Sequence, residues 1–74
     1  MNEQQLDARG LKCPQPVLRL AVRAPQMLPG ERLTVWGDCP TFERDMRTWC
    51  ERLGKTLLEV SEDPDGAKRV RIQF

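Results

Sequence analysis

Two segments of the chain carry apolar residues at the spacing of an amphipathic helix, and each follows a short stretch of strand-forming residues. From Pro14 onward we expect an apolar face made of Val17, Leu18, Ala21, Val22 and Ala24. Pro25 should end this helix near Arg23 or Ala24. The second stripe is stronger and ends before Gly54; its members are Phe42, Met46, Trp49, Cys50 and Leu53.

The remaining segments either alternate between apolar and polar residues or are rich in residues that favour β-strands. Strands are predicted at residues 6–8, 32–37, 56–62 and 68–74, while the polar first five residues are expected to be frayed. The last two strands are joined by Asp63-Pro64-Asp65-Gly66, a sequence typical of a tight turn. The chain therefore ends in a hairpin, and the order is βαβαββ.

This order predicts an α+β fold. We expect one domain over residues 1–74, because a chain of this length has no room for a second core. The economical packing is a two-layer α/β sandwich, with a four-stranded mixed sheet and two helices on one face. Strands one and two would run parallel, so the junctions Cys13-Pro14 and Cys39-Pro40 would share one sheet edge.

The composition of the chain narrows the classes of function that it can have. Twelve basic and eleven acidic residues nearly cancel, which argues against direct binding of nucleic acid or of an anionic membrane. The apolar runs are too short for a transmembrane span or a signal peptide, so we expect a cytoplasmic protein. The chain has no histidine, which removes the usual general base and zinc ligand; we expect neither a metal nor a cofactor. Its three cysteines are an odd number and cannot all be paired with one another, so we expect no framework of structural disulfides.

Cys13 is the candidate reactive residue. The fixed φ of Pro14 suits the first position of a helix, so Cys13 falls at the N-cap, where the helix dipole favours a thiolate. The nearby cations Arg9 and Lys12 would add to this effect, although loop cations are often merely solvated. The alternative is that Cys13 is a small buried hydrophobe, as many free cysteines are.

Over nearly its whole length the chain resembles the TusA/SirA family of small sulfur-carrier proteins. The resemblance rests on the segment from Leu6 to Leu18 that contains Cys13-Pro14-Gln15-Pro16, on Pro29-Gly30-Glu31, on Asp45, and on Trp49-Cys50 followed by Gly54-Lys55-Thr56. It implies a βαβαββ sandwich and a sulfurtransferase whose CPxP cysteine carries a persulfide. By position that residue is Cys13. Pro14 and Pro16 are the supporting residues, which we expect both to fix the entry of the helix and to hold the thiol outward.

The resemblance also implies partners. The sulfur donor would be a cysteine desulfurase or a rhodanese-like protein, and an acceptor protein would pass the sulfur toward tRNA thiolation, cofactor synthesis or sulfur oxidation. We expect the carrier to be a monomer.

We expect different roles for the other two cysteines. Many relatives carry an aspartate where this chain has Cys39, so Cys39 is either a second, resolving thiol or a neutral substitute for that aspartate. Cys50 belongs to the apolar stripe of the second helix and should be an inert core residue.

Two other functions stay open at this point. A βαβαββ sandwich also resembles the C-terminal domain of translation initiation factor three, and Lys68, Arg69 and Arg71 on the last strand could contact RNA. Alternatively, Cys13 and Cys39 could form a thiol redox switch if they lie close together.

Overall fold

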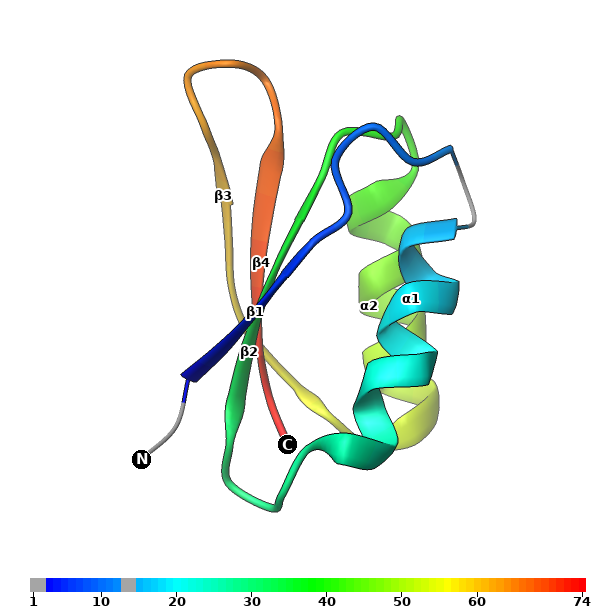
Figure 1. Ribbon diagram of the computed structural model, residues 1–74, viewed down its shortest axis with the longest axis vertical. Coiled ribbons are helices and arrows are strands. Elements are labelled where there is room, and N and C mark those ends of the chain that lie inside the picture. Colours follow the sequence, from blue (N-terminus) through cyan, green and yellow to red (C-terminus); the bar gives the residue numbers. More distant parts are fainter. Residues whose placement is uncertain (1–2, 13–14) are drawn as a thin grey trace.

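The computed structural model describes residues 3–12 and 15–74, and within them the elements follow the predicted order (Figure 1). Their bounds are β1 Glu3–Asp7, α1 Gln15–Arg23, a short 3₁₀ helix η1 Ala24–Gln26, β2 Arg32–Gly37, α2 Phe42–Leu53, β3 Thr56–Glu62 and β4 Lys68–Gln73. None of the helices in this part of the chain is long and apolar enough to cross a membrane.

The described strands form one mixed sheet in the order β1-β2-β4-β3. β2 pairs in parallel with β1 and antiparallel with β4, and β4 also pairs antiparallel with β3. The predicted turn between β3 and β4 is confirmed, since the Gly66 N–H donates to the Asp63 carbonyl at 2.9 Å.

The expectation of a frayed N-terminus is wrong for residues 3–5. β1 starts at Glu3, and its residues pair with Arg32–Trp36 of β2 in parallel register. Because backbone pairing with a central strand satisfies N–H and C=O groups whatever the side chain, a polar segment can form an edge strand. Residues 1–2 lie outside the described part of the chain.

Both helices cover the same face of the sheet, as predicted (Figure 1). Leu33 and Val35 of β2 and Val70 and Ile72 of β4 point toward the helices and are fully buried. From the helix layer the core receives Leu20, Phe42, Met46, Trp49 and Cys50.

The buried face of α1 differs from the expected one. Leu18 and Val22 are 57% and 70% exposed, whereas Pro16 and Leu20 are buried. Apolar residues occur on most sides of this helix, so the tertiary contacts decide which side faces the core. One such contact is the hydrogen bond that Arg23 donates to Gln4 of β1, which turns Arg23 toward the sheet. In α2 only Leu53 departs from the predicted stripe, and it is exposed.

A close approach between Gly37 and Phe42 sets the connection from β2 into α2. A Cβ added at Gly37 would overlap the ring of Phe42, the first residue of α2, and this ring is almost completely buried. The absence of a side chain at Gly37 therefore lets α2 begin close against the end of β2.

We predict that Gly37→Ala lowers the free energy of unfolding by about 1–3 kcal/mol, because the new methyl group overpacks the site. Urea denaturation followed by circular dichroism measures the change. The matched control is Phe42→Leu: in that background the same glycine substitution should cost clearly less. Equal costs in both backgrounds would contradict the proposed contact.

Candidate functional site

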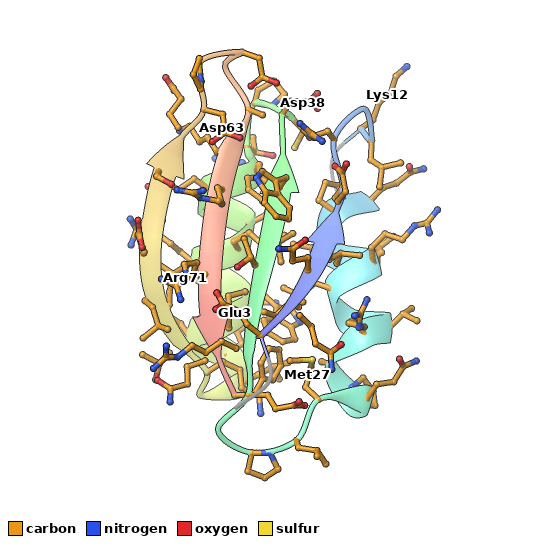
Figure 2. The ribbon with its side chains drawn as sticks, turned by 60° about the vertical axis from the view of Figure 1, so that its left-hand side comes forward. Glu3, Lys12, Met27, Asp38, Asp63 and Arg71 are labelled. Carbon is orange, nitrogen blue, oxygen red and sulfur yellow. The ribbon has the colours of Figure 1, made fainter. Side chains whose placement is uncertain are left out.

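The candidate site lies at the sheet edge where β1 and β2 lead into the helices. Cys13 and Pro14, on which the sequence-based prediction centres, lie outside the described residues. The residues on either side are described: Lys12 is exposed at this edge, on the same end of the molecule as Asp38 and Asp63 (Figure 2). The Gln15 N–H, at the start of α1, donates to the Lys12 carbonyl at 2.7 Å.

The described residues of the loop after β1 contact the loop after β2 at this edge, while the predicted junction Cys13-Pro14 itself lies outside the described residues. Beyond the last pair of the β1–β2 ladder, the Ala8 N–H donates to the Trp36 carbonyl at 2.8 Å. The Gly10 N–H then donates to both carboxylate oxygens of Asp38, each at 3.1 Å. Gly10 has a φ of 83°, a left-handed conformation that strongly favours glycine.

Asp38 was missed by the sequence reasoning. Its position directly after a predicted strand is a signal for a carboxylate that binds backbone N–H groups of a neighbouring loop. In the structure it joins the loop before α1 to the loop before α2.

Arg9 is bound to carboxylates. Its Nε and Nη2 donate to Asp7 at 2.9 and 2.8 Å, and its Nη1 lies 3.8 Å from Asp65 in the β3–β4 turn. The side-chain and backbone hydrogen bonds from Arg9 lower the pKa of Asp7 to about 2, and the same pair raises the pKa of Arg9. Asp7 is thus a structural acceptor, and the charge of Arg9 is offset; a role of Arg9 or Lys12 in activating Cys13 stays a prediction.

Pro16 has a packing role in the first turn of α1. Its side chain is fully buried at the second position of the helix. Its functional role, holding the Cys13 thiol outward, stays a prediction.

Cys39 lies at the junction between β2 and α2. Its side chain is 9% exposed, belongs to the core cluster and is disulfide-bonded. Cys39 Sγ lies 3.9 Å from Thr41 Oγ1, and the Thr41 hydroxyl donates to Asp45 at 2.9 Å. The Cys39 carbonyl accepts the Phe42 N–H at 3.0 Å, which helps to start α2.

Cys50 is a buried core residue, as predicted. Its thiol is free, and the residue is 2% exposed on the buried side of α2. Burial, with a smaller effect of Glu51, raises its pKa to about 11. A thiol with so high a pKa is almost entirely protonated at neutral pH and is a poor nucleophile.

The basic residues of β4 contact groups within the protein. Lys68 bonds Glu43 at 3.0 Å, and Arg71 pairs with Glu3 at 2.9 Å and with Glu59 at 3.5 Å. Arg69 donates to the Ser61 hydroxyl at 3.1 Å. Because these basic side chains are bound to groups of the protein itself, β4 gives no support to the alternative function of RNA binding.

The Asp7–Arg9 pair gives a prediction about titration. Since Arg9 holds the pKa of Asp7 below its ordinary value of 3.8, Asp7 should stay charged as the pH falls to about 2. Any stability that the pair provides is present above pH 4 and is lost as the pH falls through this range. In Arg9→Gln the pKa of Asp7 should rise toward its ordinary value, as measured by NMR titration. Arg19→Gln, at an exposed position on α1, is the control and should leave it unchanged.

Comparisons with known proteins agree with this fold. The family model of the sulfurtransferase TusA matches residues 4–74. Two proteins of Neisseria meningitidis, from serogroups A and B, are each 38% identical over 73 residues, which is 99% of this chain and 97% of theirs. Both carry the provisional name of sulfur carrier protein.

A solved structure is also similar. The crystal structure of a SirA-like protein from Desulfitobacterium hafniense superposes with a TM-score of 0.81 at 28% identity, and the match covers 95% of each chain. With the family match over nearly all of the sequence, these findings show that the chain belongs to the TusA/SirA family of sulfur carriers.

Proposed function

We propose that this protein accepts sulfur as a persulfide on Cys13 and passes it to an acceptor protein. The observation that carries the proposal is the sequence Lys12-Cys13-Pro14-Gln15-Pro16 in a chain of this family, whose last two residues begin α1. The described residues beside it, Lys12 and Gln15, are both exposed at the sheet edge, where a partner protein could approach.

The two helix starts differ in charge. The first turn of α1 holds no acidic residue, whereas that of α2 holds Glu43 and Asp45. The positive end of the α1 dipole is therefore not compensated by a carboxylate of its own helix, which favours an anion such as a thiolate before Gln15. This difference supports Cys13, rather than a residue before α2, as the nucleophile.

Sulfur transfer needs only thiol chemistry. The Cys13 thiolate attacks the terminal sulfur of a donor persulfide; a new S–S bond forms, the donor's S–S bond breaks, and the donor cysteine leaves as a thiolate. The reverse roles apply when an acceptor thiolate takes the sulfur from Cys13. No histidine is required in either step.

The finer assignments follow from the resemblance. The donor would be a cysteine desulfurase or a rhodanese-like protein, and the sulfur would go to tRNA thiolation, cofactor synthesis or sulfur oxidation. In this proposal the protein acts as a cytoplasmic monomer and as a sulfurtransferase, with transfer between protein cysteines.

Cys13→Ser should abolish sulfur loading and leave the fold intact, because serine is favoured at helix N-caps. The protein is incubated with a cysteine desulfurase and cysteine, and the mass of one added sulfur atom is measured on the intact chain. Cys50→Ala is the matched control and should load like the parent, since Cys50 is buried and protonated. Persulfide accumulation in Cys13→Ser would show that Cys13 is not the carrier.

A further inference from the structure

The face of the sheet that is turned away from the helices carries a hollow. Side chains alternate between the two faces along a strand, so Thr34 and Trp36 of β2 point away from the core into which Leu33 and Val35 point. Glu3 and Arg71 lie on the same open face (Figure 2). The hollow has a volume of about 370 Å³, and its lining includes Glu3, Thr34, Trp36, Glu59, Arg69 and Arg71.

One part of this lining is a complete network of ion pairs. Arg71 lies 2.9 Å from Glu3 through Nη2 and 3.5 Å from Glu59 through Nη1, so it links the two edge strands β1 and β3. The Thr34 hydroxyl donates to Glu3 at 3.5 Å, and Thr34 is only 6% exposed. The network holds two carboxylates in place with one guanidinium, and it therefore offers no charge that would attract a further anion.

Arg69 lacks such a carboxylate. Its Nε donates to the Ser61 hydroxyl at 3.1 Å, but no carboxylate in the described part of the chain lies within ion-pair distance of its guanidinium. Among the same residues, its two terminal amino groups have no acceptor. The strand register places Arg69 directly opposite Trp36, which is half-buried. An uncompensated cation and an aromatic side chain thus stand together in the hollow.

We propose that this hollow docks a partner protein that inserts a glutamate or aspartate flanked by apolar side chains. The carboxylate binds the terminal amino groups of Arg69 as a charge-assisted pair, and the flanking apolar atoms pack on the ring of Trp36. Arginine and tryptophan are the residues that most often dominate the binding energy of protein interfaces. The inference does not depend on the chemistry of Cys13.

The charges around the hollow favour a single carboxylate over a nucleic acid. Glu3 and Glu59 stand in the lining with Arg69 and Arg71, so the four charges sum to zero. One carboxylate placed at Arg69 meets the cation that has no carboxylate of its own. A chain of phosphates would bring several negative charges close to the two glutamates, which repel them.

The hollow also adjoins the end of the sheet at which the candidate site lies. Trp36 is the last residue but one of β2, and its carbonyl accepts the Ala8 N–H. Ala8 begins the loop that leads to Lys12, which is exposed at this end (Figure 2). A protein docked on the open face therefore lies next to the loop that follows β1.

NMR spectroscopy tests the docking site, because the two tryptophans lie on opposite sides of the sheet. The isotope-labelled protein is titrated with a short, capped peptide whose only charge is a central glutamate between two leucines. The indole N–H signal of Trp36 should shift and saturate, whereas that of Trp49, in the core on the helix side, should stay in place. The matched peptide with glutamine in place of glutamate should bind about tenfold more weakly.

Variants of the protein test the role of Arg69. Arg69→Gln should weaken binding of the glutamate peptide about tenfold and leave binding of the glutamine peptide unchanged. Arg69→Lys keeps the charge but loses the planar fork, so its affinity should fall between the two. Arg19→Gln, at an exposed position on α1, is the control and should bind like the parent. An unchanged Trp49 signal shows that each variant is folded.

Several results would overturn the proposal. They are an unshifted Trp36 signal at millimolar peptide, equal affinity for the two peptides, and an Arg69→Gln variant that binds like the parent. A single-stranded oligonucleotide that shifts the Trp36 signal at lower concentration than the peptide would make this face a nucleic-acid surface instead. A Trp36 shift that depends on protein concentration alone would make it a contact between copies of the chain, which also excludes the proposed occupant.

Discussion

The parallel pairing of β1 with β2 is the contact that brings the site together. Glu3–Asp7 lie in register with Arg32–Trp36, so both strands end at the same edge and lead into their helices there. The ladder continues into the loops through Ala8 and Gly10, whose N–H groups bind Trp36 and Asp38. Without this pairing, the loop before α1 would have no fixed relation to the loop before α2.

Burial gives the cysteines of one short chain different chemistry. Cys50, under α2 in the core, has a pKa raised to about 11 and is a packing residue. Cys39 is also shielded from solvent, but it lies at a helix start on the edge where the two loops meet.

The accuracy of the sequence-based predictions follows the strength of the local signal. β2, α2 and the final hairpin are predicted closely, because alternation, a strong apolar stripe and the Asp63-Pro64-Asp65-Gly66 turn act over a few residues. The start of β1 and the buried face of α1 are not predicted correctly, because both depend on contacts with residues that are distant in the sequence. Glu3 is in a strand because of β2, and Leu18 is exposed because Pro16 and Leu20 face the core instead.

By itself, the sequence determined the order of elements, the two-layer arrangement and the candidate nucleophile Cys13, since helix and strand periods and the Cys-Pro-Gln-Pro motif are local properties. Only the tertiary structure decided that Asp38 anchors Gly10, that Arg9 is compensated by Asp7 and Asp65, and that Cys39 is shielded yet beside the first loop. The physical reason is that these contacts, except for Asp7 with Arg9, join residues far apart in the chain. Their geometry exists only after the strands have paired.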